Sequence, residues 1–380
     1  MTAPQGSCDQ EFRQVWQLLA DRLACGAEAG ASVCVVQDGR TVVDLWGGVA
    51  DTASGTPWKR GTLVNTYSLT KTMTALVALK LIDSGDLDPA ETVAHYWPEF
   101  GAAGKQDVLV RHVLGHTSGV CGWSRQVALE DIYDTEASAA WLAAQEPWWK
   151  PGDGSGYQAV NHGHLVDALV RRITGRSLGE FLAAEFAEPA GADYWLGAPE
   201  SVDPRVATLV APPPSGVDYA ALPPESVFVK TMTNPVIPPA VTTTRPYLAA
   251  EIGGANGQGN AQSVAHLQSI ISHDGVLGGK RYLTESTVRR IFEQQSDSVD
   301  RVLGSRVRFG LGYALPTTDA MPEIPQGNVC WWTGFGGSVV VNDLDRRLTV
   351  AYVMNRMAPG LIGAENARAY LNAAYGSLDT

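Results

Sequence analysis

The chain has 380 residues, 45% of them apolar, which is enough for a sizeable core in two ordinary domains or in one large domain with an insertion. Its 28 basic and 40 acidic residues give a formal net charge of -12, and it has no Lys/Arg cluster of the kind that follows phosphates, which argues against nucleic acid as a partner. Because no secretory signal and no apolar run of membrane-spanning length is present, we expect a soluble, cytoplasmic chain with no membrane contact.

The cysteines are odd in number and scattered. They are Cys8, Cys25, Cys34, Cys121 and Cys330, and no two form a Cys-x-x-Cys pair. Such spacing indicates neither a disulfide framework nor a zinc ribbon. We therefore expect reduced cysteines that serve as packing residues.

The first elements are a helix and a strand pair. Apolar residues at helical spacing run from Phe12 to Leu23, and Gly26 follows as a stop. Residues 31–36 and 40–46 then flank Asp38-Gly39, a dipeptide that favours a tight hairpin turn because it tolerates positive φ. An amphipathic helix followed by two antiparallel strands is predicted.

The C-terminal end repeats this pattern. Residues 338–341 and 348–354 are rich in β-branched side chains and are joined by a polar turn, and a helical pattern follows at 364–375. Helical patterns fill the middle of the chain, at 72–82, 136–144, 162–173 and 178–186. The predicted fold class is α/β: an antiparallel β-sheet flanked by helices and built from both termini, with a mostly helical inserted region. We predict one domain from residues 1–70 and 250–380 and a second from 71–249.

Residues 212–246 contain nine prolines, so no helix is expected there. A solvated linker is the simplest interpretation, but Val227, Phe228, Val229 and Ile237 are too apolar for one. We therefore expect an extended segment that packs over the helical region.

Ser68 and Lys71 lie at the start of the most apolar helix of the chain. Positions i and i+3 share one helix face, so the Ser68 hydroxyl and the Lys71 amine can touch. A nucleophile, a base and unpaired backbone N–H groups would then meet at one point. The alternative is an N-cap Ser with a Lys that reaches the surface. The run to Leu79 offers that ammonium no carboxylate before Asp83, which favours the catalytic interpretation.

Two further segments could complete a site for nucleophilic catalysis. Tyr157 follows the glycine-rich loop 151–156 and precedes a helix, where a phenol can be presented into a cleft. The run 332–338, Trp-Thr-Gly-Phe-Gly-Gly-Ser, opens the C-terminal strand pair, and its glycines allow close approach of a ligand to the backbone.

With these segments in this order, the chain resembles the serine β-lactamase and penicillin-binding-protein superfamily. It looks most like the class C β-lactamase-like branch called family VIII carboxylesterases. The likeness extends from about Ala31 to Met357 and includes the runs 114–119, 157–159, 174–178 and 352–357.

The resemblance implies a role for each residue of the motifs. Ser68 would be the nucleophile, Lys71 its activating partner, and Tyr157 the base that later protonates the leaving group. The oxyanion would be bound by the backbone N–H groups of Ser68 and Phe335. Trp332, Thr333, Gly334 and Asn161 would contact the substrate, and the resemblance implies no metal and no cofactor.

Two departures from the class C pattern bear on substrate. Class C enzymes have Asn two residues after the tyrosine, whereas this chain has Ala159, and its nearest amide is Asn161. They also have Lys before Thr-Gly, where this chain has Trp332. Since indole offers an N–H donor and apolar area but no charge, an uncharged ester fits better than a carboxylate-bearing β-lactam. An ordinary aromatic packing pair at Trp331-Trp332 is an equally weighted alternative.

Three other signals have simpler explanations. The run 175–179 matches the Gly-x-Ser-x-Gly elbow, but it follows a helix, and Ser177 with Glu180 reads as a capping box. His162 and His164 could suggest a metal, but i and i+2 lie on different helix faces and no third ligand is near in sequence. The segment around His116 reads as a turn near the cleft.

The sequence thus predicts a serine carboxylesterase that hydrolyses small neutral carboxylic esters through an acyl-enzyme. The first alternative is an acyltransferase of the same fold. A β-lactamase or D-amino-acid peptidase is a weaker alternative, because of Trp332, and a catalytically inactive binding module is the non-enzyme alternative. The expected partner is a small-molecule ester, and the oligomeric state is left open.

Overall fold

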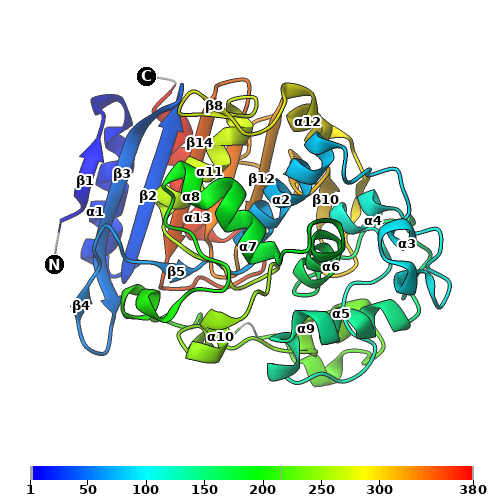
Figure 1. Ribbon diagram of the computed structural model, residues 1–380. Helices are drawn as coiled ribbons and strands as arrows, with labels where there is room; N and C mark the ends of the chain where they lie inside the picture. The colour runs from blue at the N-terminus through cyan, green and yellow to red at the C-terminus, as the bar shows by residue number, and fades with distance from the viewer. Residues whose placement is uncertain (1–2, 215, 379–380) are drawn as a thin grey trace.

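In the computed structural model, which describes residues 3–214 and 216–378, strands from both ends of the chain form one antiparallel sheet (Figure 1). The strand order of this ten-stranded sheet is β1-β3-β2-β14-β13-β12-β11-β10-β9, and β4 pairs with β3. Its strands are β1 (Gln5–Cys8), β2 (Gly30–Gln37), β3 (Arg40–Asp51), β4 (Thr56–Pro57), β9 (Ser296–Val299), β10 (Arg306–Phe309), β11 (Ala314–Leu315), β12 (Val329–Thr333), β13 (Val339–Asp343) and β14 (Leu348–Met354). Two short pairs lie outside it, β5 (Val64–Asn65) with β6 (Gln258–Gly259) and β7 (Val276–Leu277) with β8 (Lys280–Arg281).

The predicted hairpins are confirmed. β2 and β3 are joined at Asp38 and Gly39, whose φ angles of 48° and 74° are those of a tight turn. β13 and β14 pair as expected, and β14 then pairs with β2. This β14–β2 pairing joins the two ends of the chain in the middle of the sheet, so the fold class predicted from the sequence is correct.

Helices cover both faces of the sheet. α1 (Arg13–Cys25) and α13 (Glu365–Gly376) pack together on one face, and α11 (Ala261–Ser272) covers β2, β13 and β14 on the other. β14 shows the alternation, because Tyr352 stacks on Tyr370 of α13 whereas Thr349 bonds Ser272 of α11. α1 ends at Gly26 in the left-handed conformation, as its sequence predicts.

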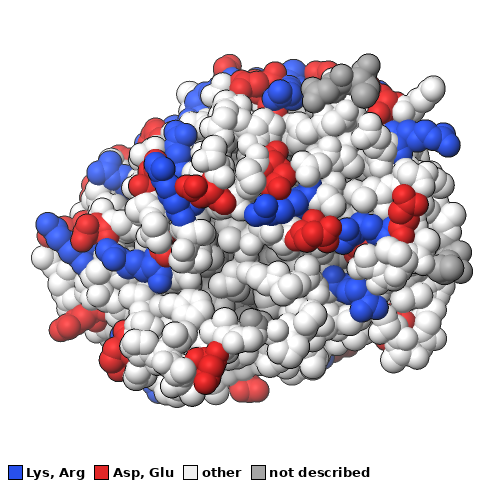
Figure 2. Space-filling model, turned by 180° about the vertical axis from the view of Figure 1, so that it is seen from behind, with Lys and Arg blue, Asp and Glu red and all other residues white. Residues whose placement is uncertain are grey.

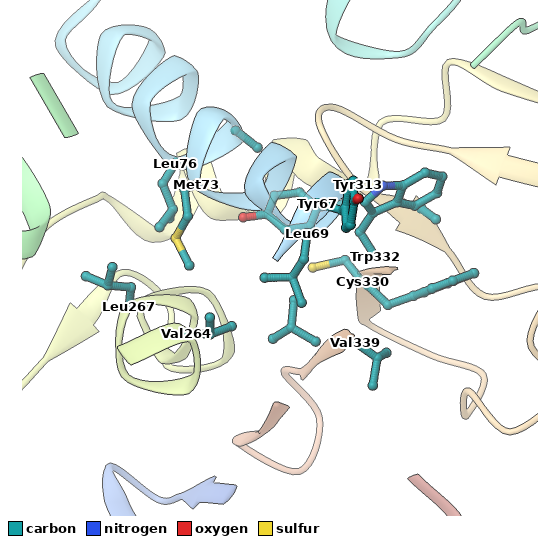
Figure 3. Packing of buried hydrophobic residues seen from close by; sticks show 14 of the residues in the cluster. Tyr67, Leu69, Met73, Leu76, Val264, Leu267, Tyr313, Cys330, Trp332 and Val339 are labelled. Carbon is teal, nitrogen blue, oxygen red and sulfur yellow. The ribbon is translucent and has the colours of Figure 1, made fainter. Parts of the chain in front are cut away.

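The central helix α2 (Thr70–Ser84) is buried over most of its length. Figure 3 shows Met73 and Leu76 on the side of α2 that faces Val264 and Leu267 of α11. A single turn of 3-10 helix, η2 (Tyr67–Leu69), precedes α2 and continues into it. The start of α2 is therefore fixed between the sheet layer and the helical region.

The helical region lies beside the sheet (Figure 1). The remaining helices are α3 (Val93–Tyr96), α4 (Val110–Leu114), α5 (Thr135–Ala144), α6 (His162–Thr174), α7 (Leu178–Leu182), α8 (Glu188–Ala190), α9 (Val227–Thr233), α10 (Arg245–Ala249) and α12 (Glu285–Arg289). A π-helical turn at Ala183–Ala187 joins α7 to α8. The helices predicted at 136–144, 162–173 and 178–186 are thus present. The division into 1–70 with 250–380 and 71–249 stays a prediction.

Two expectations need correction. The proline-rich stretch contains a helix, α9, because residues 225–234 lack proline and the Ser226 hydroxyl caps the helix by accepting from the Val229 N–H. Cys25 is exposed at the end of α1, so it is not a packing residue, whereas Cys34, Cys121 and Cys330 are buried. Among the helices in the described ranges, none combines the length and apolar character needed to cross a bilayer.

Candidate active site

Ser68 and Lys71 meet where η2 passes into α2. The Lys71 Nζ lies 3.2 Å from the Ser68 Oγ, and it donates to the main-chain carbonyls of Ala159 and Gly254 at 2.7 Å each. Lys71 is 2% exposed, whereas Ser68 is partly exposed. The amine is therefore held inside the protein by backbone groups while the hydroxyl remains accessible.

Burial favours a neutral amine at Lys71. It lowers the pKa of Lys71 well below its usual value, because desolvation disfavours the charged ammonium. A neutral amine has two N–H groups and one lone pair. With the two carbonyls taking the N–H groups, the lone pair is left for the Ser68 hydroxyl, which is the geometry of a general base.

Tyr157 lies beside both the Lys71 amine and the Ser68 side chain. Its ring centroid is 4.7 Å from the Lys71 Nζ, and its backbone N–H donates to the Asp300 carboxylate at 3.1 Å. Burial raises the pKa of the phenol, while the neighbouring Ser68 and Trp332 side chains lower it less. The hydroxyl has no completed hydrogen bond to any described residue, and its raised pKa favours the protonated phenol, which leaves its O–H free to donate.

The residue before the nucleophile has an unusual backbone. Tyr67 has a φ of 44°, which is rare for a bulky side chain. Its N–H donates to the Asn65 Oδ1 at 2.9 Å, and its carbonyl accepts from the Thr70 Oγ1 at 2.5 Å. Local hydrogen bonds on both sides thus hold the strained turn that presents Ser68.

The end of β12 approaches this turn closely. A Cβ added to Gly334 would lie 2.1 Å from the Thr66 carbonyl oxygen, so only glycine allows the contact. The next residue is Phe335, whose ring meets the Tyr67 ring edge-on at 5.5 Å. Within residues 3–214 and 216–378, the N–H groups of Ser68 and Phe335 have no acceptor. Two free donors therefore come from adjacent segments, as an oxyanion site requires.

Trp332 is mainly a packing residue. It is 4% exposed and its ring contacts Tyr157, Phe309, Trp331 and His116. Its indole Nε1 is buried and unpaired among the described residues, beside the Tyr157 phenol. These contacts fit the aromatic packing interpretation and leave one free donor near the site. Thr333, the last residue of β12, is also buried.

Asn161 is completely buried, and its Nδ2 donates to the Val120 carbonyl at 3.0 Å. Its Oδ1 has no hydrogen-bond partner among the described residues. The expected contact of Asn161 with a substrate stays a prediction. At position 159, where class C enzymes have Asn, this chain has Ala159, whose main-chain carbonyl accepts from Lys71.

The histidines lie behind the site. His116 adopts a φ of 59° in a turn, and its Nδ1 accepts from the Gln158 N–H. His162 packs 4.9 Å from it, and burial lowers the pKa of His162 to about 3. His164 bonds the Ile132 carbonyl instead. In the part of the chain that the structure describes, no three His, Cys, Asp or Glu residues gather as metal ligands.

Ser177 is structural, as predicted. Its hydroxyl accepts from the Glu180 N–H at 3.1 Å, and the Glu180 carboxylate accepts from the Ser177 N–H at 2.8 Å. This capping box starts α7 after the helix α6. The Gly-x-Ser-x-Gly match is therefore a helix cap in this fold.

Sequence reasoning missed two groups that hold the site. The Gly254 carbonyl binds Lys71, and the buried Asp300 holds the backbone before Tyr157. Asp300 also accepts from the N–H groups of Val302 and Leu303, at 2.9 Å each. An Asp two and three residues before such N–H groups is a turn signal, but nothing local indicates its contact with Tyr157.

Charges of both signs are interspersed over the face shown in Figure 2, without a large patch of either. This face therefore offers no basic track for a polyanion. Around Ser68, the charged and titratable groups are few and buried, with Lys71 on one side and Asp300 behind Tyr157. The charged side chains named next to Ser68 and Tyr157 are therefore buried ones.

Comparison with known proteins gives a consistent result. A family model described as Beta-lactamase matches residues 15–375. Esterase/beta-lactamase LipL from Mycobacterium tuberculosis is 32% identical over 373 residues, which cover 95% of this chain and 85% of that protein. A solved family VIII carboxylesterase superposes with a TM-score of 0.92 at 37% identity, over 99% of this chain and 100% of that one. A penicillin-binding protein homologue from Caulobacter crescentus gives 0.91 at 32% identity, with 99% and 100% covered.

The sequence resemblance is thereby confirmed over nearly the whole chain. The match spans the segments that carry Ser68, Lys71, Tyr157 and Phe335, and the similar structures keep the same sheet and helical region. Since one family model covers residues 15–375, this chain belongs to the Beta-lactamase family and is a serine hydrolase.

Proposed function

We propose that this protein is a carboxylesterase that hydrolyses small, neutral carboxylic esters through an acyl-enzyme on Ser68. The observation that carries the proposal is the buried Lys71 amine, held by two carbonyls with its remaining position 3.2 Å from the Ser68 Oγ. The similarity to a family VIII carboxylesterase and to LipL supports the same activity.

In the acylation step, the Ser68 Oγ attacks the ester carbonyl carbon while its proton passes to the Lys71 amine. The carbonyl π electrons move to the oxygen, and the free N–H groups of Ser68 and Phe335 stabilise the resulting oxyanion. Collapse of this intermediate re-forms the carbonyl and breaks the bond to the alcohol oxygen.

The Tyr157 phenol is suited to the leaving group. Since burial raises its pKa, it stays protonated and can donate to the departing alkoxide, and the proton on Lys71 can then restore it. Deacylation repeats the path with water as the nucleophile. Water adds to the acyl carbon, its proton is taken by the same pair, and Ser68 leaves with a proton returned to its oxygen.

The preference for neutral substrates rests on the surroundings of the site. Trp332 stands where class C relatives have the Lys that binds a carboxylate, and the buried Asp300 behind Tyr157 would repel one. Aromatic rings of Tyr67 and Phe335 meet next to the nucleophile. These groups favour an apolar ester over an anionic one.

The test is a Ser68→Ala variant assayed with a short-chain nitrophenyl ester. We expect kcat to fall by a factor on the order of 10⁴ or more, because the covalent path is lost. A fluorophosphonate should label wild type at Ser68, as read by intact mass, and leave the variant unlabelled. Near-normal esterase activity in Ser68→Ala, with Ser177→Ala as the matched control, would contradict the proposal.

Hydrolysis of β-lactams is the second candidate function. It is favoured by the 32% identity to LipL, which is described as an esterase/beta-lactamase. The β-lactamase activity is measured by the turnover of nitrocefin compared with that of the short-chain ester, and we expect the ester to be preferred.

Acyl transfer is measured by adding an alcohol or amine acceptor and analysing the products by mass spectrometry. A transfer product that exceeds the hydrolysis product would replace hydrolysis by transfer as the main reaction.

A further inference from the structure

A buried chain of hydrogen bonds leads from the far face of the sheet to the turn that carries Phe335. Asn366, on the first turn of α13, donates from its Nδ2 to the Gly336 carbonyl at 3.2 Å. The same Nδ2 donates to the Tyr352 hydroxyl at 3.2 Å, and Tyr352 donates to the Glu28 Oε1 at 2.7 Å. Glu28 and Asn366 are 3% exposed and Tyr352 is completely buried.

The turn depends on this contact for its shape. Gly336 and Gly337 have φ angles of 94° and 118°, and a Cβ on Gly337 would lie 2.1 Å from the Asn366 Oδ1. The Gly336 carbonyl also accepts from the Ala358 N–H at 2.8 Å. Asn366 thus packs against the turn and bonds it, one residue beyond the free N–H of Phe335.

We propose that Asn366 is a positioning residue for the oxyanion site, which fixes the Phe335 N–H by holding the Gly336 carbonyl, and that Glu28 controls this contact through Tyr352. The inference rests on the proposed function, in which Phe335 supplies an oxyanion donor. Asn366 touches no reacting atom. It acts through the turn, where a small displacement of the donor weakens stabilisation of the transition state.

The direction of donation depends on the charge of Glu28. An ionised carboxylate can only accept, so the Tyr352 O–H points toward it and the Tyr352 oxygen is free to accept from Asn366. A protonated Glu28 can donate to Tyr352, which then turns its own O–H toward Asn366. Tyr352 and Asn366 would then present donors to each other, and the contact with Gly336 would loosen.

The groups that face Glu28 come from three elements. Arg22 of α1 donates to its Oε1 at 3.2 Å, and also binds Glu365 of α13 through both carboxylate oxygens at 3.0 Å. Tyr352 of β14 donates to the same Oε1, and the Tyr370 hydroxyl of α13 lies near the carboxylate. Burial raises the pKa of Glu28 to about 7, while Tyr352 and Arg22 oppose the rise. The carboxyl can therefore change charge in the neutral range.

The experiment measures kcat, KM and the affinity for a short alkylboronic acid, which forms a tetrahedral adduct with Ser68. Asn366→Asp keeps the shape of the side chain but removes the two N–H donors of its amide. If the buried Asp prevents folding, Asn366→Ala is measured in its place. We expect kcat and boronate affinity to fall about tenfold together, with KM nearly unchanged. Asn372→Asp, the same change at an exposed position of α13, is the control and should match wild type.

The pH profile tests the link to Glu28. In wild type, kcat should fall as pH drops through about 7, as Glu28 takes up its proton. This step should disappear in Glu28→Gln, which cannot titrate, and also in Asn366→Ala, where the link to Gly336 is cut. Persistence of the step in both variants would overturn the control by Glu28.

The outcomes separate this inference from the proposed function. If wild type shows neither fluorophosphonate labelling of Ser68 nor a burst of product, the acyl-enzyme mechanism itself is wrong. If wild type labels and turns over but both Asn366 variants match it in kcat and boronate affinity, only the positioning role is overturned.

Discussion

Among residues 3–214 and 216–378, two lysines are buried, in different environments. Lys71 is 2% exposed at the start of α2, and Lys105 is completely buried in the loop that precedes α4. Both donate to two main-chain carbonyls, Lys71 to Ala159 and Gly254, and Lys105 to Ala102 and Gln145. Burial lowers the pKa of both, to about 8 for Lys105 and well below its usual value for Lys71.

The two amines differ in the neighbours that they have besides the carbonyls. Glu146 raises the pKa of Lys105 and so keeps it nearer the charged form, and its other neighbour is the ring of Phe100, 5.3 Å away. No carboxylate of the described residues pairs with Lys71, and the last position of its amine faces the Ser68 hydroxyl. A buried amine bound by carbonyls is therefore not a catalytic signal by itself. The hydroxyl within reach makes it one.

The largest predicted effect separates the two lysines directly. Lys71→Met should lower kcat by a factor on the order of 10³ to 10⁴, because general base catalysis is lost. Lys105→Met should leave kcat within a few-fold and lower the free energy of unfolding by about 1 to 3 kcal/mol, because buried carbonyls lose their donors. Steady-state kinetics and urea denaturation measure both. Loss of kcat in a folded Lys105→Met would break the comparison.

The second prediction concerns the partner of Lys71. Tyr157→Phe removes the free donor and should lower kcat about 10²-fold with little change in KM, since proton transfer contributes factors of that size. The double variant Lys71→Met/Tyr157→Phe should lose less than the product of the two factors, because both residues serve one proton path. An unchanged acylation rate of Tyr157→Phe in a stopped-flow burst would place the proton donor elsewhere.

A third prediction introduces a lysine at position 332, close to Lys71, and tests whether a charge there changes the choice of substrate. Trp332→Lys should raise the kcat/KM ratio for a carboxylate-bearing ester over its methyl ester by about tenfold or more, since a charge-assisted contact contributes roughly 1.5 to 3 kcal/mol. The ratio is the informative quantity, because lost indole packing lowers both rates. An unchanged ratio in a variant that is folded by circular dichroism would leave Trp332 with its packing role alone.

Stability against pH tests the charge of Lys71. Because its pKa is lowered on folding, the unfolded chain binds more protons between the folded pKa and the ordinary value, so stability rises with pH in that window. The slope reaches about 1.4 kcal/mol per pH unit for one proton. Lys71→Met should reduce the slope measured by denaturation across alkaline pH, and an equal slope would mean that Lys71 is charged in the folded protein.

The smallest effect on activity is expected at Ser177, the serine of the Gly-x-Ser-x-Gly match. Ser177→Ala removes a helix cap and should cost about 1 kcal/mol of stability, with kcat and KM unchanged. Thermal unfolding and ester hydrolysis measure the two quantities. A strong loss of kcat with intact folding would revive the Gly-x-Ser-x-Gly elbow as the nucleophile.

Much of the fold follows from local patterns. The Asp38-Gly39 turn and the Gly26 helix end are as predicted, because both depend on φ angles that only a few residues adopt. The helix α9 was not predicted, because the number of prolines was counted over the whole stretch 212–246, whereas ten consecutive residues within it lack proline. The contact of the Asn161 Nδ2 with the Val120 carbonyl could not be predicted from the sequence, because it depends on how two segments 41 residues apart pack together.

The sequence by itself determined the pairing of Ser68 with Lys71, since three positions on one helix turn bring two side chains together wherever the helix lies. Only the tertiary structure decided which groups bind the amine. They are carbonyls of Ala159 and Gly254, which are 88 and 183 residues from Lys71 along the chain. Every residue has a main-chain carbonyl, so the sequence cannot indicate which of them binds the amine. The position of each carbonyl depends on how distant segments pack. The same holds for the contact between Asn366 and Gly336, which no local pattern could indicate.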